Sequence, residues 1–171
     1  MTTSNPPTAP PAREPGTGPR WQLAGFEALD THALYELLRL RAEVFVVEQS
    51  CAFQDVDGLD PQALHLLGWH GADLVAYARC FPAGVTFAEA SIGRVVTRGS
   101  VRGAGWGHLL IAEAIRVVVE HWGRQQPIRI GAQARLKKFY EGHGFADVGR
   151  PYVEDGIDHI EMVRVPGPIP T

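Results

Sequence analysis

The chain has 171 residues, 45% of them hydrophobic, and 16 basic against 19 acidic side chains give a net charge of −3. This size and composition suit one globular domain and leave little room for a second. The acidic balance and the lack of a basic block speak against a nucleic-acid partner. No apolar run approaches the ~18 residues of a membrane span, and no signal-peptide pattern precedes the domain. We therefore expect no membrane partner and a cytoplasmic location.

The two ends of the chain differ in composition from the region between them. Residues 1–19 are rich in Pro, Ser, Thr and Gly and carry no large apolar residue after Met1. Such a segment cannot bury enough surface to offset its ordering entropy. The sequence predicts a disordered tail at 1–19, a folded domain at 20–165 and a flexible tail at 166–171. Cys51 and Cys80 form no CxxC pair, and we expect both thiols to be reduced.

The first elements are predicted from capping and apolar periodicity. Residues 21–26 fit a strand, and Asp30 or Thr31 can cap a helix that runs to Val47. The loop at 48–62 contains several Asp, Gly and Pro residues. The later elements are strands at 63–70, 74–81 and 91–97, a helix at 105–122, a strand at 128–132, a helix at 135–141, and strands at 145–149 and 159–165. This order predicts a mixed α/β sheet flanked by helices.

A glycine-rich segment, Arg102-Gly-Ala-Gly-Trp-Gly107, joins a predicted strand to a long apolar helix. Glycines let the backbone approach an anion closely, and the N-terminal end of a helix favours negative charge. A pyrophosphate fits such a loop, and Arg102 can add a charge-assisted contact. By itself, however, the pattern is equally consistent with glycines that merely turn the chain.

Two better-known phosphate loops do not fit this segment. A P-loop needs Lys and then Ser or Thr after its last glycine, whereas His108 and Leu109 follow Gly107. A dinucleotide fingerprint beginning at Gly103 fails at His108, which stands in the place of its third glycine. That fingerprint also opens a domain, and this loop lies in the middle of the chain.

The surrounding motifs resemble those of the GCN5-related N-acetyltransferase (GNAT) superfamily. Its cofactor motif is a strand, then Arg/Gln-x-x-Gly-x-Gly/Ala, then a helix, which matches Val95–Thr97 followed by Arg102, Gly105 and Gly107. The run Ala134–Phe145, with its Phe-Tyr and Gly-Phe pairs, is similar to the second motif of the family. The resemblance implies a single-domain, mostly antiparallel mixed sheet that is splayed at its centre and flanked by helices.

Longer motifs resemble the ElaA-type subfamily and cover nearly all of residues 34–164. They are Leu37–Gln49, the acidic loop from Cys51 to Asp60, Leu74–Arg79, Ile92–Val96, Gly131–Ala134 and Glu154–Met162. Several long motifs in one order are far more specific than a single glycine loop.

The resemblance implies an acyl-CoA co-substrate, expected to be acetyl-CoA, and assigns residues to it. The pantetheine arm would pair with the backbone of Val95, Val96 and Thr97, and a main-chain N–H near Val96 would polarise the thioester carbonyl. Gln133 stands where the family often has Asn, so its contact with CoA differs in reach. The pyrophosphate would be held by Arg102 and by the main-chain N–H groups of Gly103, Ala104, Gly105, Trp106, Gly107 and His108.

The resemblance also implies that Tyr140 is the general acid, because a phenol stays protonated at neutral pH and can donate to the departing sulfur. An amine acceptor must lose a proton, so a base is needed. His159 is preferred because imidazole exchanges protons near neutral pH, and Glu161 shares its strand face. The remaining candidates are His65, Glu154 and Asp155. His65 also fits a hydrogen-bonded core histidine, and the other two also fit a turn.

The acidic loop at Asp55, Asp57 and Asp60 does not predict a metal site. It resembles the start of a calcium-binding EF-hand loop, but position 12 is Leu66 instead of a bidentate Glu. We expect no metal, and either a solvated acidic loop or one that attracts a cationic acceptor. The expected partner is a small-molecule or peptide amine, and a homodimer is possible.

Two rival functions remain open at this stage. A non-catalytic acyl-CoA-binding module would keep the glycine loop without the chemistry, although the retained Tyr140 argues against it. An acyl-homoserine-lactone synthase is the second rival, because the run Arg41–Phe45 resembles an Arg-x-x-Val-Phe element of those enzymes. Those enzymes usually lack so clean a glycine loop.

Overall fold

The computed structural model describes residues 18–50 and 53–170. The predicted tail at 1–19 lies almost wholly outside the described residues, as does Cys51. The described strands are β1 (Arg20–Gly25), β2 (Leu64–His70), β3 (Asp73–Phe81), β4 (Ala90–Thr97), β5 (Ile128–Gln133), β6 (Phe145–Glu154) and β7 (Ile157–Arg164). The α-helices are α1 (Thr31–Arg41), α2 (Trp106–Trp122) and α3 (Lys137–Glu141).

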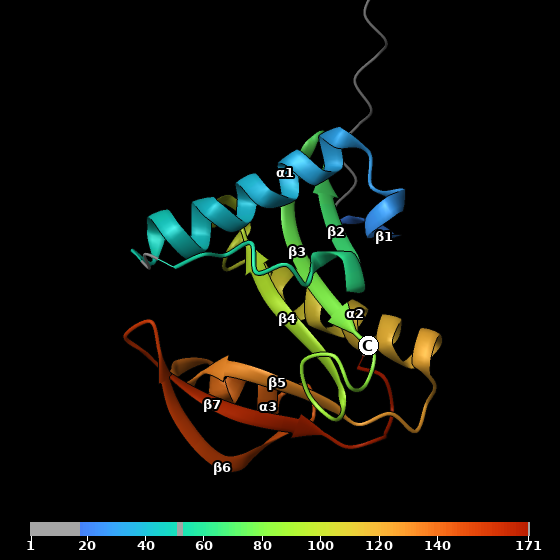
Figure 1. The fold of residues 1–171 in the computed structure, drawn as a ribbon, viewed down its shortest axis with the longest axis vertical. Coiled ribbons are helices and arrows are strands. Elements are labelled where there is room, and N and C mark those ends of the chain that lie inside the picture. Colours follow the sequence, from blue (N-terminus) through green and yellow to red (C-terminus); the bar gives the residue numbers. More distant parts are fainter. Residues whose placement is uncertain (1–17, 51–52, 171) are drawn as a thin grey trace, which may run out of the picture.

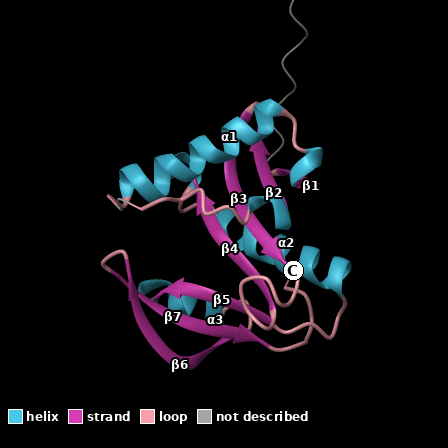
Figure 2. Ribbon diagram, in the orientation of Figure 1, coloured by secondary structure: helices cyan, strands magenta, loops and turns pink. Residues whose placement is uncertain are grey.

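The seven described strands form one sheet in the order β1-β2-β3-β4-β5-β7-β6. Every neighbouring pair is antiparallel except β4 and β5, which are parallel. Helix α1 lies on one face of the sheet, and α2 and α3 lie on the other (Figures 1 and 2). The expected fold class, a mixed and mostly antiparallel sheet flanked by helices, is confirmed.

Each face of the sheet has its own hydrophobic core. Helix α2 buries a wide apolar stripe, including Leu110, Ile111 and Ile115, against β3, β4 and β5. Helix α1 buries Leu37 and Leu40 against the other face of β2 and β3. Each fully buried aliphatic side chain contributes about 1.5–3 kcal/mol, so these two layers fix the positions of both helices.

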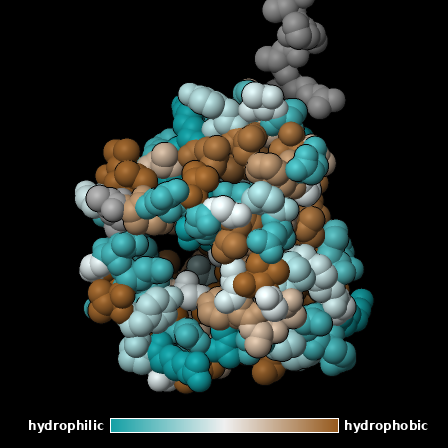
Figure 3. All heavy atoms as spheres, viewed as in Figure 1, coloured by the Kyte–Doolittle hydropathy of each residue, from teal (hydrophilic) through white to brown (hydrophobic). Residues whose placement is uncertain are grey.

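The sheet opens between β4 and β5. These strands pair only at Ala90↔Ile128 and Ser91↔Arg129, near the beginning of each strand. Beyond Ser91 they diverge, so the remaining edge of β4 has no strand partner on that side (Figure 1). The space-filling view shows a hollow between the two halves of the molecule at this level (Figure 3). The expected central splay is therefore present.

Strand β4 carries a bulge where the splay begins. Arg79 of β3 faces Gly93, but Tyr77 faces Val96, so β4 has one residue more than β3 in this interval. Arg94, within the bulge, has a positive φ of 50°. An extra residue bends a strand and shifts the alternation of its side chains and main-chain groups.

Three segments differ from the sequence-based expectation. The predicted helix to Val47 changes after Arg41 into a π-helical turn, Ala42–Glu48. Strands β6 and β7 are longer than predicted and meet in a tight turn at Asp155 and Gly156, both with positive φ. Beyond Phe145, β6 is exposed along its whole length, so no regular apolar alternation marks its outer half. The segment after Arg164, expected to be flexible, packs Ile169 against the core.

Among the described residues, no helix is long and apolar enough to cross a membrane.

Candidate active site

The glycine loop lies at the N-terminal end of α2, as the sequence predicts. Gly103 and Gly105 have φ of 80° and 83°, and Gly105 is the N-cap of the helix. Both conformations favour glycine, and open space surrounds the position of a Cβ at either residue. The loop residues 102–105 are exposed. The loop is thus shaped by its glycines and accessible to a ligand.

Four main-chain N–H groups of this loop donate to no acceptor within the described chain. They belong to Gly103, Gly105, Trp106 and Gly107, whereas the N–H groups of Ala104 and His108 bond to carbonyls of the loop. Unpaired N–H groups at the start of a helix, here one of 17 residues, can bind an anion. The loop therefore fits a pyrophosphate, although the predicted set of six donors is reduced to four in this conformation.

Arg102 points back toward the end of β4. Its Nε and Nη2 donate to the Thr97 carbonyl at 3.0 and 2.9 Å, and its Nη2 lies 2.7 Å from Glu48 Oε2. The guanidinium thus links the glycine loop to the π-helical turn after α1. It lies beside the unpaired edge of β4, where Val95, Val96 and Thr97 have no partner strand on the side of β5.

Tyr140 lies close to the glycine loop through its neighbour in α3. The ring of Phe139 lies 3.6 Å from the position of a Cβ at Gly107, so α3 packs on the first turn of α2. The rings of Phe139 and Tyr140 are 5.0 Å apart. The structure therefore brings the predicted acid and the predicted pyrophosphate loop together.

Tyr140 is only 6% exposed, and burial raises the pKa of its hydroxyl to about 12. No hydrogen bond joins this hydroxyl to another residue in the described ranges 18–50 and 53–170. A buried phenol without a protein acceptor keeps its proton and can donate it to a ligand atom.

His108 takes part in a side-chain contact that supports this junction. Its Nδ1 lies 2.9 Å from Nε2 of His143, and its ring lies 4.7 Å from that of Phe139. Burial, followed by the charge of His108, lowers the pKa of His143. The pair therefore joins the start of α2 to the turn after α3, and the lowered pKa of His143 disfavours a state in which both rings carry a positive charge.

His159 and Gln133 lie on the opposite face of β5 and β7 from α2 and α3. They face each other across the two strands, and His159 also faces Tyr152 of β6 with the rings stacked at 5.3 Å. The Gln133 amide donates to Gln49 Oε1 at 3.2 Å and accepts from Arg135 at 3.0 Å. This face is thus separate from the glycine loop and open toward the segment after α1.

One hydrogen bond defines the tautomer of His159. Its Nδ1 lies 2.8 Å from the carbonyl oxygen of Ile157 and must donate, because a carbonyl only accepts. In the neutral ring Nε2 then carries a lone pair, and no described residue hydrogen-bonds to it. Nε2 is therefore available as a proton acceptor.

Two of the other base candidates, Glu161 and His65, are engaged elsewhere, and Glu154 is exposed at the end of β6. Glu161 Oε2 lies 2.7 Å from Arg129. His65 is fully buried between the Tyr77 hydroxyl and the Asp60 carbonyl, so it is the core histidine that its apolar neighbours also allow. Asp155 is in the turn between β6 and β7.

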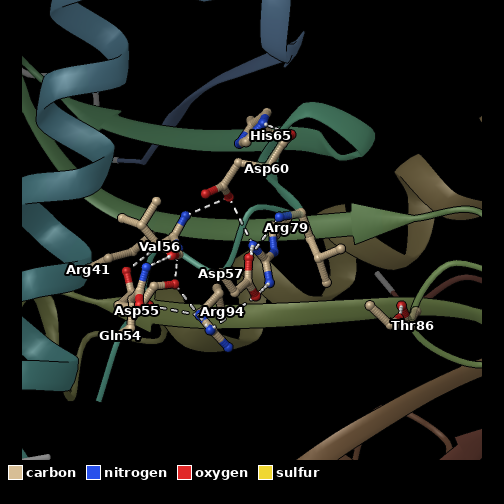
Figure 4. A network of polar contacts seen from close by, with 12 residues as sticks. Arg41, Gln54, Asp55, Val56, Asp57, Asp60, His65, Arg79, Thr86 and Arg94 are labelled. Carbon is tan, nitrogen blue, oxygen red and sulfur yellow. Dashed lines mark hydrogen bonds and ion pairs between the residues drawn. The ribbon is translucent and has the colours of Figure 1, made fainter. Parts of the chain in front are cut away.

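Two carboxylates of the acidic loop, those of Asp55 and Asp60, are buried, so the expectation of a solvated loop is wrong for them, whereas the Asp57 side chain is 26% exposed. Asp55 and Asp60 are 8% and 5% exposed. All three carboxylates are paired with three arginines that come from α1, β3 and β4: Arg41, Arg79 and Arg94 (Figure 4). The pairs join residues 14 to 39 positions apart, so the local sequence of the loop could not reveal them. The sequence analysis did not single out Arg94. The Gly93-Arg94 pair could have drawn attention to it, because a glycine inside an apolar strand often marks a bulge.

Within the described residues, no group of three or more His, Cys, Asp or Glu side chains is arranged to hold a metal ion. Cys80 is buried and is not bonded to another cysteine.

A surface hollow of about 530 Å³ lies beside Phe26, Pro61 and Trp122, at the other end of α2 from the glycine loop. None of the residues that line it belongs to the glycine loop, to α3 or to the gap between β4 and β5, so it forms no part of this site.

Known proteins share both this sequence and this fold. The Acetyltransferase (GNAT) domain profile matches residues 36–165. ElaA of Escherichia coli is 42% identical over 146 residues, which cover 84% of this chain and 95% of ElaA. The crystal structure of ElaA has a TM-score of 0.80 at 40% identity and covers 85% of this chain and 99% of that one.

Two further solved structures resemble this chain, one at high and one at low sequence identity. An acyl-CoA N-acyltransferase from Pseudomonas aeruginosa has a TM-score of 0.82 at 40% identity, covering 86% of this chain and 99% of that one. The acyl-homoserine-lactone synthase LasI has a TM-score of 0.69 over 90% of this chain and 93% of its own, but its 15% identity shows a shared fold alone. The family profile and the 42% identity together show that the chain belongs to the GNAT family of acyl-CoA N-acyltransferases and is of the ElaA type.

Proposed function

We propose that this protein transfers an acetyl group from acetyl-CoA to a primary amine by direct attack. The observation that carries the proposal is the arrangement around the gap between β4 and β5. An anion-binding helix start lies at the end of the gap, a buried phenol lies on one face of the sheet, and an available imidazole nitrogen lies on the other.

The residues around the gap fit acetyl-CoA part by part. The four unpaired N–H groups of the loop suit the pyrophosphate. The unpaired edge of β4 at Val95–Thr97 suits the amide groups of the pantetheine arm, which pair as an added strand does. Arg102 can exchange Glu48 for a phosphate oxygen. Most of these contacts use the main chain, so they require this fold more than particular side chains.

The two faces of the sheet suit the two proton transfers. The amine nitrogen attacks the thioester carbon and loses a proton to Nε2 of His159, directly or through water. The carbon–sulfur bond breaks, and the Tyr140 hydroxyl donates its proton to the departing sulfur. The products are an amide and CoA with a free thiol, and both side chains recover their protonation states from solvent.

A panel of primary amines, with release of free CoA thiol as the readout, tests this proposal. It should include small amines, aminoglycoside-like polyamines, peptide N-termini and lysine side chains. We expect saturable, amine-dependent thiol release. Binding of acetyl-CoA without turnover on any amine would contradict catalysis and support the non-catalytic binding module instead.

A further inference from the structure

The bulge in β4 is held by a cluster of six charged residues, which we call the ionic cluster: Arg41, Arg79, Arg94, Asp55, Asp57 and Asp60. The three positive and three negative charges of these residues balance to zero. Figure 4 shows them between α1, the loop after it, β3 and β4. Such a balanced and hydrogen-bonded arrangement is the condition under which buried charges persist.

Arg94 connects the bulge to this cluster. Its Nε donates to Asp55 Oδ1 at 2.8 Å, and its Nη2 lies 3.2 Å from the Asp55 carbonyl and 3.3 Å from Asp57 Oδ2. The same residue has φ of 50°, a conformation that a non-glycine residue adopts only when its surroundings impose it. The ion pairs of the Arg94 side chain supply that restraint.

Asp55 is fixed in turn from the other side. Its Oδ2 accepts from Nε of Arg41 at 2.7 Å, and its carbonyl accepts from Nη2 of Arg41 at 2.8 Å. The Arg41 side chain is completely buried. Asp60 also accepts from Arg41 at 2.7 Å and from Arg79 at 2.9 Å, so α1 and β3 share the restraint. Through Asp55, the position of Arg94 is therefore set by the core.

The bulge is also where the gap opens toward the expected thioester. The main-chain N–H groups of Val95 and Thr97 follow it. The Arg98 N–H donates to the Val75 carbonyl, so by the alternation of an antiparallel pair the N–H of Val96, which faces Tyr77, points to β3, and those of Val95 and Thr97 point to the edge without a partner. An oxyanion-type donor is effective when it is held in place before the charge develops. A shift of the bulge would move these donors relative to the main-chain N–H groups of Gly103, Gly105, Trp106 and Gly107.

We propose that Arg94 and Asp55 are positioning residues for acyl transfer, which hold the β4 bulge so that its main-chain N–H groups polarise the thioester carbonyl. This proposal rests on the acyltransferase function proposed above. It gives the ionic cluster a role in the reaction, in addition to its role in stabilising the fold. Neither side chain needs to touch the substrate.

The direct test is the carbonyl stretch of acetyl-CoA labelled with ¹³C at the acetyl carbonyl, measured by difference infrared spectroscopy on the bound complex. In the unmutated protein we expect the band at lower wavenumber than in free acetyl-CoA. In Arg94→Ala and Asp55→Asn we expect that shift to be lost. For the same variants, kcat should fall about 10-fold to 100-fold, while the Kd of CoA stays within about twofold.

Two further variants separate positioning from folding. Arg94→Lys keeps one donor and should restore part of the band shift. Arg116→Ala is the matched control, because Arg116 also bonds two carboxylates, Glu113 and Glu120, but on the outer surface of α2. If Arg94→Ala does not fold, Arg94→Gly carries the test, because glycine adopts φ of 50° without strain.

The outcomes distinguish this proposal from the proposed function. A normal band shift and normal kcat in folded Arg94 variants would overturn the positioning role and leave the acyltransferase intact. An unmutated protein that binds acetyl-CoA without shifting the band would also overturn it. If the unmutated protein turned over none of the amines in the panel, that result would contradict the proposed function instead.

Discussion

The two halves of the sheet hold their charged groups in different ways. In the half formed by β1 to β4, the ionic cluster buries Asp55, Asp60 and Arg41 and gives each of them at least two partners. In the other half, Arg129 of β5 binds Glu161 of β7 and also Glu89, which comes from the loop before β4, and all three side chains are about one-fifth exposed. The first arrangement restrains the backbone, whereas solvent screens the second.

The same contrast applies to the groups expected to react. His159 Nε2 and the Tyr140 hydroxyl both come from the C-terminal part of the chain, and neither is hydrogen-bonded to a described residue. The first half therefore provides a fixed wall, and the second half provides groups that can exchange protons. Substitutions in the first half should change the free energy of unfolding, and those at the reacting groups should change the rate.

The largest effect is expected for Asp60→Ala, which leaves the buried guanidinium groups of Arg41 and Arg79 without one shared partner. Removing one member of a buried ionic arrangement costs about 3–5 kcal/mol. Glu89→Ala, the matched change in the exposed arrangement, should cost under about 1 kcal/mol. Urea unfolding of both variants measures this difference. Equal losses in the two variants would show that the halves are not distinct.

Tyr140→Phe should mainly affect the rate. Loss of a general acid lowers kcat on the order of 10²-fold or more, and the hydroxyl has no described protein partner whose loss would destabilise the fold. Because burial raises the pKa of Tyr140 to about 12, the phenol should stay protonated, and kcat should show no loss from its ionisation up to about pH 10. Steady-state kinetics from pH 6 to 10 provide the measurement. Unchanged turnover in Tyr140→Phe would remove this residue from the mechanism.

His159→Gln should lower kcat about 10-fold to 100-fold by removing the proton acceptor. His121→Gln is the matched control, because His121 also donates from Nδ1 to a carbonyl, that of Val117 at 3.0 Å, on α2. The pH–rate profile of each variant is the measurement. If the rate of His159→Gln fell toward low pH in the same way as that of the unmutated protein, the base would be another group.

The smallest effect concerns stability in acid. The hydrogen bonds from Arg79 hold the pKa of Asp57 well below its ordinary value of 3.8. The unfolded carboxylate therefore binds a proton at higher pH than the folded one. The stabilisation is complete above about pH 4 and is lost as the pH falls through the lower folded value. Asp57→Asn should flatten this decline, as followed by urea unfolding between pH 7 and pH 3. An equally steep decline in the variant would mean that other carboxylates cause it.

Periodicity and turn chemistry predicted the elements near the glycine loop. Helix α2 and strands β2 to β5 lie within one or two residues of their expected bounds, because their apolar residues face buried cores. The glycines predicted an anion-binding loop by themselves, but its assignment to CoA and the role of Tyr140 came from the resemblance to a family.

The rest depends on contacts between distant segments. The ionic cluster joins α1, its following loop, β3 and β4, and each of its carboxylates looks like a loop residue when read locally. The outer half of β6 is exposed on both faces, so its pairing with β7, which places Tyr152 beside His159, left no regular alternation of apolar and polar residues. Similarly, the hydrogen bond that defines the tautomer of His159 is set by backbone geometry.

Calorimetric titration of acetyl-CoA into the full chain tests the central claim most directly, because every step requires binding at the start of α2. We expect saturable binding of one acetyl-CoA per chain, and weaker binding in Gly105→Asp. That variant adds a negative charge and a side chain at a residue with φ of 83°, in the middle of the unpaired N–H groups. Absence of binding to the unmutated protein, or equal binding to Gly105→Asp, would contradict the assignment of this loop as the site of CoA.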